Sequence, residues 1–240
     1  SAACFDESGR NGTSDHFPTV PVKELGIGYG AICGIDTNDA LFCEATTVAL
    51  DLEPPDDDWL KVSVGTQFAC GIRVDDGSID CFGSENFGTC TYSPPAGQLD
   101  PPDGSFTDIA TGTNTSCAIR TDGSVACWGG VELDEEAGEC ELVHDEGQLE
   151  APDGSFLGIS VATSHACGIR QDHGVACWGA GTTDDCETGS VSCRQARPPS
   201  GRFEQVVTGT VHSCAMTVDR KVTCWGHDGG GRTTPPAEFQ

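Results

Sequence analysis

Short alternating apolar stretches, separated by polar turns, run along this chain in a pattern that recurs five times. In the third copy, Cys117 and Ile119 alternate with small residues, and so do Val125 and Cys127, with Thr121-Asp122-Gly123 between them. A period of two predicts β-strands, and a three-residue loop with a Gly predicts a hairpin. Both faces of this hairpin are small or apolar, so we expect it to belong to a sheet packed between two neighbours.

The same hairpin is recognised at five pairs of cysteines: Cys33 and Cys43, Cys70 and Cys81, Cys117 and Cys127, Cys167 and Cys177, and Cys214 and Cys224. Members of a pair are 10 or 11 residues apart, and successive first cysteines are 37, 47, 50 and 47 residues apart. An aromatic residue stands 11 residues before the first cysteine in four copies, as Trp59, Phe106, Phe156 and Phe203, and Val22 stands there in the first. Self-similarity at this spacing predicts a repeat architecture.

Each aromatic residue opens a further predicted strand, so every repeat is expected to form a small antiparallel sheet. The hairpin loops differ between repeats. The second has four residues, Val74 to Gly77, the fourth has His173 where the third has Gly123, and the fifth has Asp219-Arg220 and no Gly. We therefore expect the turn type to vary, and the first repeat, with Glu44-Ala45 in place of an aromatic-Gly pair, to be the least regular.

Cysteines that oppose each other in adjacent strands lie within disulfide reach, which predicts five disulfides inside the hairpins. Zinc ligation is disfavoured, because the chain has no C-x-x-C pair and neither His nor Cys recurs at ligand spacing. Five cysteines remain, and their number is odd: Cys4, Cys90, Cys140, Cys186 and Cys193. We expect a local bridge between Cys186 and Cys193, a bridge between neighbouring repeats from Cys90 to Cys140, and a single Cys4.

The repeated motifs are aromatic-x-x-Ile/Val, His-x-Cys-Ala/Gly-Ile-Arg, Asp-Gly-x-Val-x-Cys-Trp-Gly, Gly-Gln-Leu and Pro-Pro. Together they resemble the regulator-of-chromosome-condensation repeat, especially bacterial extracellular members with cysteines in the same two places. The resemblance covers residues 22–239 and implies an all-β fold, a β-propeller with one four-stranded blade per repeat. The best-known members have seven blades, whereas five repeats are counted here.

We therefore expect a closed five-bladed propeller with intra-blade disulfides over residues 22–240. The alternative is part of a larger ring, which would leave blade edges open. Its repeats span about 22–58, 59–105, 106–155, 156–202 and 203–240. Residues 1–21 would form a tail or a ring-closing strand.

Charge and cysteine content narrow the setting. The chain has 38 acidic and 12 basic residues, a formal net charge of −26, which disfavours binding to nucleic acid or anionic lipid. Fifteen cysteines indicate an oxidising location, extracellular or at the cell surface. No apolar run approaches the ~20 residues of a membrane span, and no secretory leader is seen, so we expect a mature or trimmed form. Attachment to a membrane would require acylation of Cys4, whose setting faintly resembles a lipoprotein site; the alternative is an ordinary tail cysteine.

No catalytic residue is predicted, because the sequence lacks a nucleophile elbow, a P-loop and a zinc-protease motif. His165 and His212 occupy one repeat position, and we interpret them as strand-end side chains bonded to backbone. No cofactor is predicted. Calcium is the one candidate, at the acidic clusters Asp56–Asp58, Glu132–Glu141 and Asp184–Asp185, although none matches a calcium loop.

Binding is expected on the variable segments 84–100, 130–150 and 180–197, which would gather on one face of a propeller. The candidate residues are Glu85, Asn86, Tyr92, Glu135, Glu136, Asp184 and Asp185. The leading hypothesis is a module that binds a protein with a basic surface through that face. The alternative is a lectin-like propeller that binds carbohydrate. An inhibitor of a secreted enzyme and a lyase-type enzyme rank below both.

Overall fold

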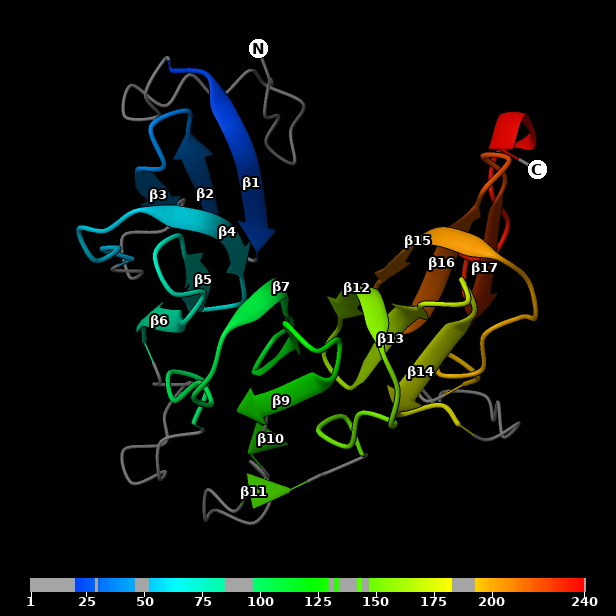
Figure 1. The fold of residues 1–240 in the computed structure, drawn as a ribbon. Coiled ribbons are helices and arrows are strands. Elements are labelled where there is room, and N and C mark those ends of the chain that lie inside the picture. The colour runs from blue at the N-terminus through cyan, green and yellow to red at the C-terminus, as the bar shows by residue number, and fades with distance from the viewer. Residues whose placement is uncertain are drawn as a thin grey trace.

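Five separate antiparallel sheets, one per repeat, make up the fold (Figure 1). The computed structural model describes residues 20–28, 30–45, 52–84, 97–129, 132–133, 142–143, 147–182 and 193–239. Blade 1 consists of β1 (Val22–Gly28), β2 (Ala31–Asp36) and β3 (Leu41–Ala45), and blade 2 of β4 (Trp59–Val64), β5 (Phe68–Arg73) and β6 (Ile79–Gly83). Blade 3 consists of β7 (Phe106–Thr111), β8 (Thr115–Arg120) and β9 (Val125–Gly129).

Blade 4 consists of β12 (Phe156–Val161), β13 (His165–Arg170) and β14 (Val175–Gly179), and blade 5 of β15 (Phe203–Thr208), β16 (His212–Thr217) and β17 (Val222–Gly226). Two short strands, β10 (Glu132–Leu133) and β11 (Leu142–Val143), pair with each other, and a 3-10 helix covers Ala237–Phe239. Each blade therefore has three strands among the described residues, and the expected fourth strand is not seen there.

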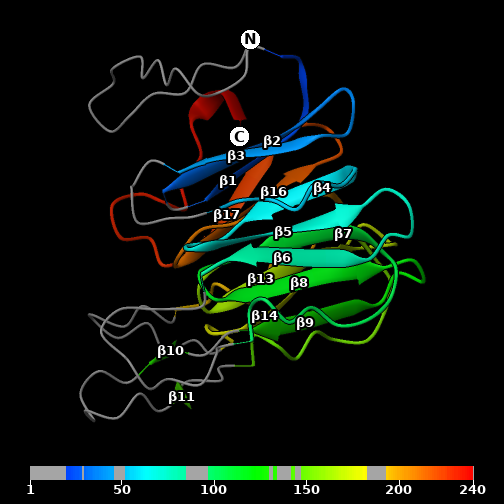
Figure 2. The ribbon, with the colours of Figure 1, turned by 90° about the vertical axis from the view of Figure 1, so that its left-hand side faces the viewer.

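The first strands of the blades follow one another along the inside of an arc, from β1 through β4, β7 and β12 to β15 (Figure 1). Figure 2 shows the sheets of blades 1 to 3 stacked one above another. The arc is open between blade 1 and blade 5, where β1 and β15 do not pack together as neighbouring first strands do. The closed five-bladed ring expected from the repeat count is thus not the arrangement seen in the structure.

Every hairpin carries the disulfide that its cysteine spacing predicts. Cys117 faces Cys127 across β8 and β9, and the other four pairs hold the same register. The Cα atoms of each pair are 4.0 Å apart. Directly opposed strand positions are close enough for a bridge without distorting the sheet, so the prediction of five intra-hairpin disulfides is confirmed.

The hairpin loops are more uniform than their sequences suggest. A residue with positive φ stands at the equivalent place in every loop: Asp39, Gly77, Gly123, His173 and Arg220, with φ between 67° and 88°. In four of the five blades, the same pair of backbone hydrogen bonds closes a three-residue loop, as in Gly123 N to Arg120 O at 2.9 Å. The expectation of varied turn types was wrong for these four, because hairpin register dictates the left-handed conformation even where the residue is not Gly.

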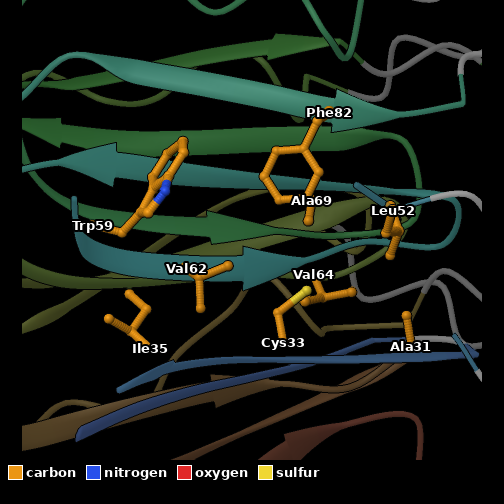
Figure 3. Close-up of a cluster of buried hydrophobic side chains, with 9 residues drawn as sticks. All are labelled: Ala31, Cys33, Ile35, Leu52, Trp59, Val62, Val64, Ala69 and Phe82. Carbon is orange, nitrogen blue, oxygen red and sulfur yellow. The ribbon is translucent and has the colours of Figure 1, made fainter. Parts of the chain in front are cut away.

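The hydrophobic core lies between blades. Figure 3 shows the contact of blades 1 and 2, where Cys33 and Ile35 of β2 point toward Val62 and Val64 of β4. The opening aromatic residues are almost fully buried, and in blades 2 to 4 the Arg of the Ile-Arg motif lies over the aromatic ring of its own blade. In blade 3, Arg120 also donates to the carbonyl of Asp103 at 2.8 Å, which ties the Pro-Pro-Asp-Gly turn to the sheet.

A Gln residue lies in the segment between adjacent blades, and its backbone carbonyl accepts a hydrogen bond from the Trp of the next Cys-Trp-Gly motif. The indole N–H groups of Trp128, Trp178 and Trp225 donate to the backbone carbonyls of Gln98, Gln148 and Gln195 at 3.2, 2.9 and 2.9 Å. The Gly-Gln-Leu segments therefore join one blade to the following blade. In the last of these segments the chain reads Arg194-Gln195-Ala196, so Gln195 fills this role without the motif.

The two outer flanks of the arc are less buried than the inner blade contacts. In β1, Leu25 is 40% and Ile27 64% exposed, whereas their counterparts in β4, Val62 and Val64, are each 5% exposed. Val22, which replaces the buried aromatic residue, is 38% exposed. The difference follows from position, since no described strand packs on the outer side of β1.

Candidate functional site

The turns that join the first strand of each blade to its second strand meet in one axial pocket. This pocket has a volume of about 400 Å³, and residues of all five blades line it. They are Ile27, Gly28, Val64, Gly65, Thr66, Thr111, Gly112, Thr113, Ala162, Thr163, Thr208, Gly209 and Thr210. Because the repeats are in phase, equivalent residues of every blade arrive at the same end of the axis.

Glycine allows the turns to approach one another closely. A Cβ atom on Gly28 would overlap the carbonyl of Gly65, and a Cβ on Gly65 would lie 2.8 Å from the carbonyl oxygen of Gly112. A Cβ on Gly112 would in turn overlap the carbonyl of Ala162. The floor of the pocket is therefore packed backbone, which offers peptide groups rather than side chains to a ligand.

Threonine and serine hydroxyls link the blades around this pocket. Thr113 and Thr163 are hydrogen-bonded through their hydroxyls at 2.8 Å. Deeper in the axis, Ser63 bonds Thr111 and Ser160 bonds Thr208, each at 2.9 Å. Below them, the ammonium group of Lys61 pairs with Asp108 at 2.6 Å. The rim is thus polar and uncharged among the described residues, suited to hydrogen bonding with a peptide or hydroxyl group and not to proton transfer.

The predicted binding residues lie elsewhere. Glu85, Asn86, Tyr92, Glu135, Glu136, Asp184 and Asp185 fall outside the described residues, as do Cys4, Cys90, Cys140 and Cys186. Cys193 is buried and disulfide-bonded, and its partner is outside the described part of the chain. The axial pocket was not predicted from the sequence, although a recurring pattern marks it. A small residue followed by Thr comes directly after the first strand in four repeats, at 65–66, 112–113, 162–163 and 209–210.

One buried pair has the spacing of a base and a nucleophile. His165 Nε2 lies 2.8 Å from the hydroxyl of Ser213, which is also 3.2 Å from the carbonyl of Gln195. Both side chains have 0% exposure, so a substrate does not reach them. Burial and the neighbouring His212 lower the pKa of His165 to about 4, which keeps the imidazole neutral. The pair joins blades 4 and 5, and the expected backbone partner of His165 is instead a side chain.

The tryptophans do not form a sugar-binding surface. Trp128, Trp178 and Trp225 are 7%, 5% and 9% exposed, and their N–H groups are already bonded to backbone. A lectin with one pocket per blade needs an accessible aromatic face in each repeat, which these three do not offer.

The described ranges hold neither a metal-binding cluster nor a membrane-spanning helix. No group of three or more His, Cys, Asp or Glu side chains is placed there to hold a metal ion. In the first acidic cluster, Asp57 pairs with Arg73. No helix of the described residues is long and apolar enough to cross a membrane.

Comparison with known proteins gives a consistent fold. The family model described as "Regulator of chromosome condensation (RCC1) repeat" matches residues 106–130, which is blade 3. Comparison with curated protein sequences finds no match.

Among solved structures, the chain is similar to the CRINKLY WD40 ectodomain of the Arabidopsis thaliana receptor kinase ACR4, with a TM-score of 0.58 and 22% identity over 88% of this chain and 65% of that one. It is similar to the entire ectodomain of the Physcomitrella patens receptor kinase CR4, with a TM-score of 0.64 and 20% identity over 94% of this chain and 55% of that one. It is also similar to yeast RCC1 (Prp20), solved with Kap60, with a TM-score of 0.59 and 13% identity over 86% of this chain and 56% of that one.

The chain thus spans between 55% and 65% of the length of these three structures. Identities at this level establish the fold and not a shared activity. Blade 3 carries an RCC1 repeat, and the five disulfide-bonded blades have the fold of an RCC1-type β-propeller.

Proposed function

We propose that this protein is an extracellular or cell-surface interaction module that binds a partner protein over the axial pocket. The observation that carries the proposal is the convergence of all five blades on that pocket, with backbone and Thr hydroxyls at its surface. A site assembled from equivalent turns on a rigid scaffold is how repeat proteins commonly present a binding surface.

Two further observations support the setting. Five disulfides in the described residues fit an oxidising environment outside the cytosol. Structures of similar fold include the ectodomains of two plant receptor kinases and the yeast protein Prp20p, whose reported binding is to Gsp1p and histones. Because this protein has a formal net charge of −26, we expect its partner to have a basic surface.

Retention of proteins from the native secretome on the immobilised protein tests this proposal. A specific partner should be retained at low salt and released as NaCl is raised, because ionic screening weakens attraction between opposite charges. Thr66→Trp and Thr163→Trp place a large ring at the pocket rim and should abolish retention. Thr223→Trp, at an exposed position of β17, is the matched control and should retain the partner.

Unchanged retention by both rim variants, with folding verified by circular dichroism, would place the contact elsewhere. Binding on a glycan array that the rim variants lose would instead identify the pocket as a carbohydrate site.

A further inference from the structure

A second pocket lies on the outer flank of blade 5. It has a volume of about 370 Å³ and is lined by Thr210, Val211, His212, His227 and Arg232. Thr210 also lines the axial pocket, so the two hollows adjoin. Blades 1 to 4 are each covered on this side by the next blade, whereas no described strand packs on this side of blade 5.

Comparison of the repeats shows how His212 differs from its buried counterpart, His165. Its counterpart in blade 4, His165, is covered by blade 5 and bonds Ser213. His212 occupies the same position one blade later, where the covering blade is not present among the described residues. Its ring lies against the backbone of Gly209, and its Nδ1 is buried without a hydrogen-bond partner in the described structure. A side chain that is structural in blade 4 therefore lines a pocket in blade 5.

His227 is held beside it by the backbone. Its N–H donates to Val211 O at 2.9 Å, and the N–H of Gly229 donates to His227 Nδ1 at 3.1 Å. Because Nδ1 is the acceptor, the neutral ring carries its proton on Nε2 and remains a donor there. A Cβ atom on Gly229 would lie 3.0 Å from Arg232 Nη1, so the guanidinium folds back over this Gly-rich turn.

Arg232 brings a positive charge to this pocket, although the protein as a whole is strongly acidic. Lys23, Lys61 and Arg73 each pair with a carboxylate, whereas Arg232 has no ion pair among the described residues. Asp228, which follows His227 in the chain, accepts the N–H of Thr233 at 3.0 Å. Hydrogen bonds from Thr233 lower the pKa of Asp228, and the positive charge of His227 lowers it further, so this carboxylate stays ionised and is already bonded.

We propose that the pocket formed by His212, His227 and Arg232 binds a small oxyanion group, a carboxylate or a phosphate. The planar guanidinium matches either group with two parallel N–H bonds, and each imidazole adds a donor and, when protonated, a charge. The site is distinct from the proposed protein contact at the axis. It would allow an anionic group to bind at the flank of a protein that otherwise repels anions.

Histidine ring signals in NMR spectra of the intact protein test this inference. Titration with sodium phosphate, and separately with sodium acetate, should shift the signals of His212 and His227 saturably, beyond the effect of sodium chloride at equal ionic strength. Response to one salt alone assigns the site to that anion.

Arg232→Gln should weaken binding about tenfold or more, since a charge-assisted bond to an anion is lost. Arg220→Gln removes an exposed cation of the same blade outside the pocket and should leave binding unchanged. Thr66→Trp should also leave it unchanged, which separates this site from the axial one. Shifts equal to those in chloride, or an Arg232→Gln variant that binds as well as the parent, would overturn the proposal.

Discussion

At the scale of single residues, the hairpin loops place non-glycine residues in a conformation that favours glycine. Arg220 has a φ of 67° in the loop where Gly123 has 88°. A left-handed conformation costs an L-residue roughly 1 kcal/mol relative to glycine. The fold tolerates this cost in three of its five loops, because the disulfide and the neighbouring ladder determine the register.

Arg220→Gly should therefore raise the free energy of unfolding by about 0.5–1 kcal/mol. The contact of Arg220 with Glu204 is 4.0 Å long and exposed, so its loss should matter little. Urea unfolding of the oxidised protein measures the effect. Gly123→Ala should destabilise by more than this amount, because its Cβ atom would also lie 2.9 Å from Ser155 Cβ. A destabilised Arg220→Gly variant would show that the loop conformation is not left-handed.

His165 should make stability depend on pH. Its folded-state pKa of about 4 lies below the ordinary histidine pKa of 6.5, so the unfolded chain binds a proton at a higher pH than the folded chain does. Stability is thus fully present above pH ~6.5 and falls as pH drops toward ~4, by up to about 3 kcal/mol.

Chemical unfolding measured at several pH values, in parallel for His165→Thr, checks this expectation. Blade 3 has a threonine, Thr115, at the repeat position of His165. Threonine does not titrate, so the variant should lose this part of the pH dependence. Identical pH profiles for the parent protein and His165→Thr would contradict the burial of a neutral imidazole.

At the scale of elements, each blade is a three-stranded sheet closed by its own disulfide. Replacing Cys117 and Cys127 together by Ala removes a bridge over a 10-residue separation. Loop-closure entropy gives an expected loss of about 2–3 kcal/mol. Urea unfolding should show this loss, and the other four disulfides should still form by mass analysis. A variant as stable as the parent would mean that the bridge does not constrain the unfolded chain.

The Trp-to-Gln contact is the corresponding link between elements. Trp128→Phe removes the hydrogen bond to Gln98 O and leaves a buried carbonyl with one donor fewer, at an expected cost of about 1–2 kcal/mol. Blade 2 carries Phe82 at this position naturally, so Phe82→Leu, which changes packing without any hydrogen bond, is a useful comparison. A thermal-unfolding shift for Trp128→Phe close to zero would show that the indole N–H is not used.

The strands and hairpins of the blades were largely predictable from the sequence, because period-two alternation and cysteine spacing are local signals. They determined the hairpins, their register and the disulfides. The loop conformation at His173 and Arg220 was not predictable, since it is imposed by the ladder and not by the loop residues. The role of Gln195 was not predictable, because Trp225 donates to its backbone carbonyl, a group that any residue supplies.

At the scale of the whole molecule, the five blades form an open arc rather than the closed ring expected from the repeat count. The apolar pattern predicts that blades stack, and in the structure Ile35 packs in one cluster with Val62 and Trp59. The pattern does not give the angle between neighbouring blades. That angle depends on side-chain packing over each whole interface. The axial pocket follows from the same packing, which explains why its Gly and Thr residues were not selected from sequence alone.

The arc should be visible in solution. Small-angle X-ray scattering of the monomer at low concentration should fit the open arc better than a closed five-bladed ring built from the same blades. A better fit to the closed ring would show that blade 1 packs on blade 5.

Each repeat forms its own sheet, closed by its own disulfide. Mass spectrometry of peptides from the unreduced protein tests it most directly. We expect cross-linked peptides that join Cys33 to Cys43, Cys70 to Cys81, Cys117 to Cys127, Cys167 to Cys177 and Cys214 to Cys224. A bridge from any of these cysteines to another repeat, or free thiols at these positions in freshly purified protein, would contradict it.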